Sequence, residues 1–409
     1  MRILMEALGD PQLRFSSVLI AGTNGKGSTS ATLDSILRAG GYRTGLYTSP
    51  HLSRVNERVR IEGQDISDDD FAAFYFRVDD CARRLVSEGR LKGHPSFFET
   101  MTALAFVAFA ESGIELAVLE VGMGGRLDAT NIVEPLISVI TDISLDHTLW
   151  LGETIAEIAR EKAGILRRNG VLVTLPQHPE ANNAIGEMAM ALEVRGVNAA
   201  EYVPERTVAS RAYLVDVLGE RITVDSPLSG AHQQRNVALA IAAAVELCNS
   251  HGYILSPAQI ATGIHNTRWP GRLERIQRTG KADVLLDVAH NPAGAWALRS
   301  ALSHLDPQPQ EMTAVFGCLK DKAVGEMAQI LFPMFDTVVL TEVSSPRTAS
   351  LQEMQAAAEA TGARPLTGSG ARDAFAWADK GSAADGLIVV TGSVYLVGEV
   401  RSLLEESDL

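Results

Sequence analysis

A glycine-rich stretch near the N-terminus, GTNGKGST at 22–29, carries the residue types that bind phosphate. Glycines allow backbone conformations that a Cβ would forbid, so successive N–H groups can turn toward an anion. Lys26 adds a full positive charge, and a helix predicted to begin at Ser28 adds the partial charge of its N-terminus. Because Ile20 stands where the usual Walker A motif has glycine, we predict a variant phosphate loop with these candidate residues: Asn24, Gly25, Lys26, Gly27, Ser28 and Thr29.

Three further polar residues, Ser49, Glu120 and His147, lie at or shortly after the ends of predicted strands. In open α/β sheets, ligands bind at the carboxyl ends of parallel strands. A buried acid is costly unless it is paired or binds a cation, so we predict that Glu120 is a magnesium ligand, in the role of a Walker B acid. By position alone, Ser49 is either a site residue or part of a Ser-Pro turn, and His147 is either a site residue or a structural histidine.

Lys162 lies on the apolar face of a helix predicted over 152–164, because Ile155, Ala159, Lys162 and Leu166 recur at helical spacing. A lysine that faces the interior is neutral, paired or chemically altered. The alternative is a cation in the last turn that interacts with the helix dipole. The residues alone leave both interpretations open.

A mainly parallel sheet is expected to position these residues. We predict buried strands over 18–20, 44–48, 116–121, 136–141 and 170–175, a hairpin over 212–224, and helices over 28–38, 66–86, 103–110 and 231–248. The segment RWPGR at 268–272 interrupts this pattern, and a second α/β unit follows with strands over 284–288, 313–316, 337–340 and 387–390. We therefore predict two domains, 1–272 and 273–409.

Composition limits the class of partner. The chain has 409 residues, comfortable for two domains, and its formal charge of −14 gives no general attraction to nucleic acid or to an anionic membrane. Cys81, Cys248 and Cys318 are widely spaced and odd in number, which indicates reduced thiols. The apolar runs are too short for a signal peptide or a spanning helix. We expect a soluble, cytoplasmic protein with small-molecule substrates and no nucleic-acid or membrane partner.

Eight ordered motifs resemble folylpolyglutamate synthase, including its bifunctional dihydrofolate synthase form, in the Mur ligase superfamily. They are GTNGKGS at 22–28, TSPHL at 48–52, LEVGMGGRLDATN at 119–131, DHT at 146–148, EKAGI at 161–165, HQQRN at 232–236, WPGR at 269–272 and DVAHNP at 287–292. The resemblance covers nearly the whole chain. It implies a Mur-type ATPase domain with a folate site and a small β element, joined to a Rossmann-like C-terminal glutamate ligase domain.

The resemblance implies an ATP-dependent carbon–nitrogen ligase that acts as a monomer. Such an enzyme phosphorylates the carboxylate of a folate or pteroate with ATP, and the amine of L-glutamate attacks the acyl phosphate. Mg²⁺ is the implied cofactor, and K⁺ is a further candidate. Leu149 stands where some bifunctional members carry an acid. A bifunctional enzyme that also uses 7,8-dihydropteroate and a monofunctional folylpolyglutamate synthase therefore both stay open.

The resemblance also gives the candidates roles, position by position. Lys26, Glu120, His147 and Lys162 would be catalytic, and the magnesium ligands would be Ser49, Glu120 and His147. Lys162 would be carbamylated to N6-carboxylysine, which needs an unprotonated amine. Further ATP contacts would come from Asn236, Arg272, Asp287 and His290, and the folate or pteroate would contact Phe97, Phe98, Asp128 and Ala129.

Three alternatives are weaker. A peptidoglycan-type Mur ligase would need an extra N-terminal domain, for which we expect no room before Val18. A phosphate-loop kinase or switch would need no second α/β domain, and the chain has no guanine-reading NKxD motif. A binding module without catalysis is disfavoured because the lysines, the glutamate, the histidine and the serine are all present.

Overall fold

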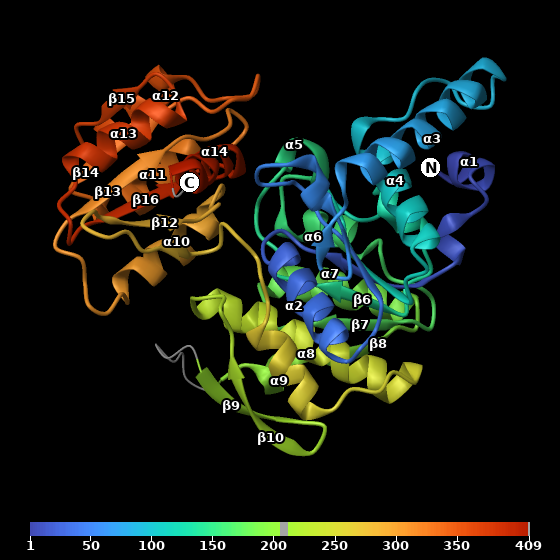
Figure 1. Ribbon diagram of the computed structural model, residues 1–409. Coiled ribbons are helices and arrows are strands. Elements are labelled where there is room, and N and C mark those ends of the chain that lie inside the picture. The colour runs from blue at the N-terminus through green and yellow to red at the C-terminus, as the bar shows by residue number, and fades with distance from the viewer. Residues whose placement is uncertain (205–211, 408–409) are drawn as a thin grey trace. The chain divides into compact units, whose positions relative to one another are not determined.

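The computed structural model describes residues 1–204 and 212–407, and the chain divides into two compact units. One unit comprises Met1–His51, Val55–Pro227 and Gln233–Arg268, and the other comprises Leu52–Arg54, Leu228–His232 and Trp269–Leu409. Each unit has its own sheet with helices packed against it (Figure 1). The last division of the chain, after Arg268, falls shortly before the boundary predicted at residue 272.

The first unit is built on an eight-stranded sheet in the order β4-β3-β2-β5-β1-β6-β7-β8. Its strands are β1 Ser16–Ala21, β2 Thr44–Tyr47, β3 Val59–Ile61, β4 Gln64–Asp65, β5 Leu116–Glu120, β6 Ile137–Ile140, β7 Val171–Thr174 and β8 Arg195–Asn198. In sheet order from β2 to β8 all neighbouring strands are parallel, whereas the pairs β2–β3 and β3–β4 are antiparallel. β1 and β5 lie inside the sheet and are almost wholly buried, which explains their continuous apolar sequences.

Helices cover this sheet, and a separate hairpin adds the predicted small β element. The helices are α1 Arg2–Ala7, α2 Lys26–Ala39, α3 Asp68–Ser87, α4 Phe97–Glu111, α5 Thr148–Leu151, α6 Ile155–Ala163, α7 Pro179–Ala191, α8 Ala231–His251 and α9 Pro257–His265. The hairpin consists of β9 Ala212–Val217 and β10 Glu220–Asp225, paired antiparallel. α6 begins with a capping box, in which Thr154 accepts from Glu157 N and the Glu157 side chain accepts in return from Thr154 N.

The second unit has a six-stranded sheet in the order β11-β12-β16-β13-β14-β15. Its elements are β11 Glu274–Ile276, β12 Asp283–Leu286, α10 Pro292–Ser303, β13 Met312–Phe316, α11 Val324–Leu331, β14 Thr337–Thr341, α12 Leu351–Glu359, β15 Leu366–Gly368, α13 Ala371–Gly381, β16 Leu387–Thr391 and α14 Val394–Ser407. All its pairs are parallel except β11–β12. Val284 and Leu286 belong to one apolar core and Leu285 to another, so both faces are covered. The predicted fold class is confirmed.

No helix among residues 1–204 and 212–407 is both long and apolar enough to cross a membrane.

Candidate active site

The loop after β1 has the geometry of a phosphate-binding loop. Gly22 and Gly25 have φ values of 153° and 90°, which glycine adopts without strain. A Cβ on Gly25 would lie 2.2 Å from the side-chain oxygen of Asn236, so a larger residue would force this contact apart. α2 begins at Lys26, directly after the loop, and the N–H groups of its first turn therefore point out of its N-terminus.

The loop is anchored to the chain that follows β6. Thr23 N and Asn24 N both donate to Asp142 O, at 2.9 and 3.2 Å. Thr141 Oγ1 donates to Asn24 O at 2.7 Å. Both the N–H and the C=O group of Asn24 are therefore used to anchor the loop.

Two other predicted nucleotide residues, Thr29 and Asn236, contact each other. Thr29 Oγ1 donates to Asn236 O at 3.3 Å, and Asn236 Nδ2 donates to Gln233 Oε1 at 2.8 Å. Thr29 and Asn236 are buried, as is Ser28. The hydroxyl of Thr29 thus connects α2 to the start of α8, which places Asn236 directly against the loop at Gly25.

Glu120 brings three predicted residues together at the end of β5. Its side chain is buried, Oε2 accepts from Ser49 N at 3.2 Å, and Oε1 lies 4.0 Å from Lys26 Nζ. Lys26 Nζ also donates to Thr23 O at 3.2 Å. Because β2, β5 and β1 are adjacent parallel strands, their carboxyl ends place serine, acid and lysine side by side.

Lys162 is buried on the inner face of α6, as the helical spacing predicted, with a relative exposure of 4%. Its Nζ donates to Gly22 O at 2.7 Å, which connects α6 to the phosphate loop. Burial lowers the pKa of Lys162 to about 7, and the charge of Lys26 acts in the same direction, whereas Asp146 and Asp128 oppose it. A substantial share of this amine is therefore neutral near neutral pH.

The loop after β5 is organised by Asp128. Its Oδ2 accepts from Gly122 N and Met123 N, both at 3.1 Å, and its Oδ1 accepts from Thr130 N at 2.9 Å and Thr130 Oγ1 at 2.6 Å. Burial raises the pKa of the Asp128 carboxyl, and these donors oppose that rise. Asp128 was predicted to contact the folate or pteroate, but its carboxylate is used for hydrogen bonds within its own loop.

The two predicted aromatic residues at the start of α4 differ in exposure. Phe98 packs against Tyr47, with ring centroids 6.0 Å apart, and a Cβ on Gly122 would lie 2.4 Å from its ring. Phe97 is 58% exposed, and the Arg58 guanidinium lies 5.3 Å from its ring centroid. Phe98 therefore belongs to the wall under the β5 loop, while Phe97 keeps an open face. Ala129 is buried in that loop.

His147 precedes α5 in a left-handed conformation, with φ of 52°, and its N–H donates to Asp146 Oδ1 at 2.8 Å. Asp146 is also one of the charges that act on Lys162. His147 therefore directly follows a residue, Asp146, whose negative charge raises the pKa of the Lys162 amine.

The remaining nucleotide candidates lie in the second unit. Asp287 is buried, and its carboxylate accepts from Leu273 N and Ala289 N, both at 3.0 Å. Burial raises its pKa, and the charge of Arg272 lowers it. His290 Nδ1 lies 2.9 Å from Val288 O, so that nitrogen donates. Asp287 and His290 follow β12, whereas Arg272 precedes β11 and acts on Asp287 through its charge.

The donor set of the first unit suits Mg²⁺. In the described part of the chain, no three His, Cys, Asp or Glu side chains could hold a metal on their own. Mg²⁺ is usually bound through one or two carboxylates together with substrate phosphates. The Glu120 carboxylate, beside Ser49 and next to the phosphate loop, matches that arrangement.

Two family models match the chain: the Mur ligase middle domain over residues 20–244, and the Mur ligase glutamate ligase domain over residues 271–394. Together with the parallel sheets and the polar strand ends, they define the protein as a Mur ligase, an ATP-dependent ligase. The predicted enzyme class is confirmed.

Similar proteins show which family of Mur ligases the chain belongs to. The chain is 37% identical to the dihydrofolate synthase/folylpolyglutamate synthase of Mycobacterium tuberculosis, covering 98% of this chain and 88% of that one. It is 36% identical to a probable bifunctional folylpolyglutamate synthase/dihydropteroate synthase of Haloferax volcanii, of which it spans 47%. The solved structure of Mycobacterium tuberculosis folylpolyglutamate synthase complexed with ADP matches with a TM-score of 0.89 at 36% identity, covering 98% of this chain and 92% of that one. The chain belongs to the folylpolyglutamate synthase family, as the eight motifs predicted.

Sequence reasoning missed several residues that hold the site. Asp142 directly follows the strand predicted over 136–141, and Arg235 lies within the motif HQQRN, but neither is among the predicted site residues. Arg167 was not considered, although its Nη2 donates to Asn131 Oδ1 at 2.8 Å and to Val133 O at 2.7 Å below the β5 loop. The position of Arg235 directly before Asn236, a predicted nucleotide contact, is a weak signal that could have suggested it.

Proposed function

We propose that the protein joins L-glutamate to the carboxylate of a reduced folate, with ATP as the phosphoryl donor, and that 7,8-dihydropteroate is a second acceptor. The contact set of Glu120, Lys26 and Ser49 beside the phosphate loop carries this proposal. That set can hold an anionic phosphoryl group next to a second anionic substrate. The folylpolyglutamate synthase family supports the choice of acceptor and amino acid.

In the first half-reaction, the acceptor carboxylate attacks the γ-phosphorus of ATP, and ADP leaves. Lys26 and the N-terminus of α2 stabilise the charge on the transferred group. Ser49, Glu120 and His147 would hold Mg²⁺, which would offset the phosphate charge. In the second half-reaction, the glutamate amine attacks the acyl carbon, phosphate leaves, and the amine loses its proton. The second unit is proposed to supply the glutamate site and the nucleotide contacts of Arg272, Asp287 and His290.

Lys162 is proposed to react with carbon dioxide to give a carbamate. Only the neutral amine attacks carbon dioxide, and the lowered pKa of Lys162, about 7, makes that form available. The charge of Lys26 would then face an anion, which reverses an unfavourable pair of cations. Mass spectrometry of the intact protein under bicarbonate would detect the adduct, and its absence in Lys162→Arg would identify the site.

Acceptor recognition is proposed to use the exposed face of Phe97 together with the loop that holds Asp128 and Ala129. Flat rings stack on aromatic faces, and Phe97 is 58% exposed. We also propose that the protein acts as a monomer in the cytoplasm.

The experiment that tests the function is ADP release with ATP, Mg²⁺ and glutamate, comparing tetrahydrofolate with 7,8-dihydropteroate as acceptor. Turnover with both is expected and would show that Leu149 does not prevent use of dihydropteroate. Turnover with tetrahydrofolate alone would leave a monofunctional folylpolyglutamate synthase. Turnover with neither acceptor would contradict the proposal.

A further inference from the structure

The residues that follow β6 hold the phosphate loop in place. Thr141 N donates to Ala21 O at 2.8 Å, and Thr141 Oγ1 donates to Asn24 O at 2.7 Å. Asp142 O accepts from the N–H groups of both Thr23 and Asn24. We call residues 141–144 the support segment, because the loop takes its position from it.

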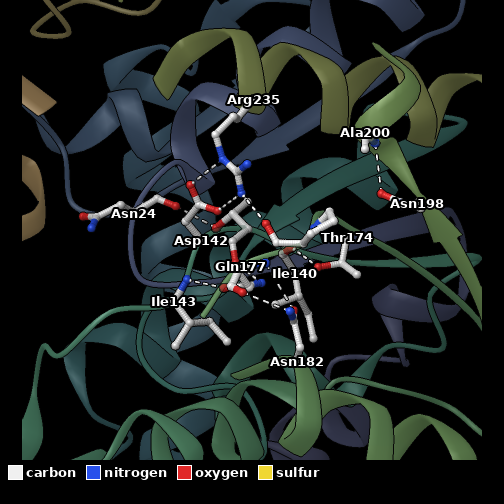
Figure 2. A network of polar contacts seen from close by, with 12 residues as sticks. Asn24, Ile140, Asp142, Ile143, Thr174, Gln177, Asn182, Asn198, Ala200 and Arg235 are labelled. Carbon is white, nitrogen blue, oxygen red and sulfur yellow. Dashed lines mark hydrogen bonds and ion pairs between the residues drawn. The ribbon is translucent and has the colours of Figure 1, made fainter. Parts of the chain in front are cut away.

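The support segment is itself clamped by an arginine from α8. Arg235 Nε and Nη2 donate to the two carboxylate oxygens of Asp142, at 3.0 and 2.6 Å (Figure 2). Nη2 also donates to Pro176 O at 3.0 Å. On the other side, Ile143 N donates to Gln177 Oε1 at 2.7 Å (Figure 2). A bidentate arginine–carboxylate pair fixes orientation as well as distance. The segment is therefore held from both sides.

The position of this pair matters more than its contribution to stability. The side chains of Arg235 and Asp142 are 31% and 37% exposed, and ion pairs this accessible to water typically contribute little to folding. The next residue of α8, Asn236, lies directly against the loop at Gly25. Two successive residues of one helix thus contact the phosphate loop and its support segment.

We propose that Arg235 is a positioning residue, which clamps Asp142 and thereby keeps the phosphate loop in its nucleotide-binding conformation. The inference rests on the proposed function, since it assumes that the loop binds a nucleotide. A loop whose amide groups already point at the ligand loses less conformational entropy on binding than a loop that must first become ordered. The competing explanation is that Arg235 attracts the nucleotide by charge alone.

The two explanations predict opposite changes in ADP affinity when Asp142 is replaced by asparagine. If Arg235 positions the loop, Arg235→Gln and Asp142→Asn should each weaken binding of ADP with Mg²⁺ roughly tenfold, since both break the same charge-assisted pair. The double variant should bind no more weakly than either single variant. If Arg235 acts by charge alone, Asp142→Asn should tighten binding, because it removes a negative charge. That result would overturn the proposal.

The test uses isothermal titration calorimetry of the full chain with ADP and Mg²⁺, with thermal unfolding as the measure of folding. Arg195→Gln is the matched control, because Arg195 from β8 pairs with Glu246 farther along the same helix, with Nη1 at 3.2 Å from Oε2. The control should leave the dissociation constant within about twofold. An equal loss in the control would contradict a specific role for Arg235.

Arg235→Lys keeps the charge but cannot form the bidentate pair, so it should restore only part of the affinity. This variant and Asp142→Asn keep the proposal testable if Arg235→Gln does not fold. A wild-type protein that binds no nucleotide would contradict the proposed function. A wild-type protein and an Arg235→Gln variant that bind equally well would contradict only the positioning role.

Discussion

The loops after β1 and β5 leave neighbouring strands of one sheet and are both rich in glycine, yet they are held in different ways. The β1 loop is held from outside, by Asp142 O and the support segment. The β5 loop is held from within, by the Asp128 carboxylate, which accepts from Gly122 N and Met123 N at 3.1 Å.

This difference decides what each loop can bind. Gly122 N and Met123 N already donate to the Asp128 carboxylate, so these two N–H groups are not available to a phosphate. In the β1 loop, Thr23 N and Asn24 N are also occupied, by Asp142 O, but α2 begins directly after them and its first-turn N–H groups point out of the helix N-terminus. Glycine content alone did not distinguish the two loops. The acid six residues after Gly122 does distinguish them, because it occupies the place that an anionic ligand would take.

α6 connects the two loops. Lys162 Nζ donates to Gly22 O in the β1 loop at 2.7 Å, and Glu161 O accepts from Arg126 N in the β5 loop at 2.9 Å. A Cβ on Gly125 would lie 2.8 Å from the carbonyl oxygens of Glu161 and Lys162, so the β5 loop lies directly on this helix.

The largest effect is expected at Glu120, which ends β5 and lies 4.0 Å from Lys26 of the β1 loop. Glu120→Gln should lower the turnover number by roughly 10² to 10³, as the loss of one preorganised electrostatic group typically does, without abolishing ADP binding. Steady-state ADP release would measure it. Glu115→Gln, at the other end of the same strand, where the carboxylate accepts from Arg43 N at 2.8 Å, is the control. Near-normal turnover in Glu120→Gln would refute the shared site.

The pH dependence of stability would test the burial of Lys162. Its pKa is lower in the folded state, about 7, than the ordinary 10.5, so the unfolded chain binds the extra proton between these values and stability rises with pH across that window. Lys162→Met lacks this term. In buffers free of carbon dioxide, the free energy of unfolding of the wild-type protein should therefore rise relative to that of Lys162→Met by on the order of 4 kcal/mol from pH 6 to pH 10. Urea denaturation at both pH values would show a constant difference if the lysine were exposed.

A change below the β5 loop should separate the two loops functionally. Arg167→Gln removes the donors to Asn131 Oδ1 and Val133 O, so we expect the KM for the folate acceptor to rise roughly tenfold while the affinity for ADP stays unchanged. Arg160→Gln, which breaks an exposed pair with Glu187, is the control. A parallel loss of ADP affinity would mean that the loops are not held independently.

The smallest effect is expected at the cap of α6. Thr154→Ala removes the side chain that accepts from Glu157 N, so it should cost about 1 kcal/mol of stability. Ser256→Ala removes the equivalent cap of α9 and should cost the same. If α6 links the loops, only Thr154→Ala should also lower turnover. Equal turnover in both variants would limit the cap to a role in stability.

The fold was predictable where hydrophobic pattern decided it. The strands expected over 18–20, 116–121 and 136–141 correspond to β1, β5 and β6 within a few residues, because continuous apolar runs are typical of buried parallel strands. α7, β8 and α9 were not predicted. β8, with the sequence RGVN, lies at the sheet edge and is mostly exposed, so it has no apolar pattern to recognise.

The burial of one candidate site residue was predictable from the sequence, whereas the residues that hold the two loops were not. Lys162 was found because helical spacing places it on an apolar face. Arg235 and Asp142 are 93 residues apart, and no spacing rule joins a helix start to a strand end across such a separation. The same holds for Arg167 and Asn131, which are 36 residues apart.

The central place of β1 also affects how the chain acquires its structure during synthesis. Ser16 in β1 pairs with Leu116 in β5, and Val18 pairs with Ile137 in β6. At the usual speed of translation, β1 waits roughly 5 to 20 seconds for its first partner. During that time an apolar segment with unpaired backbone groups can pair with a wrong strand, so misfolding is a risk before the strands that form the candidate active site have paired.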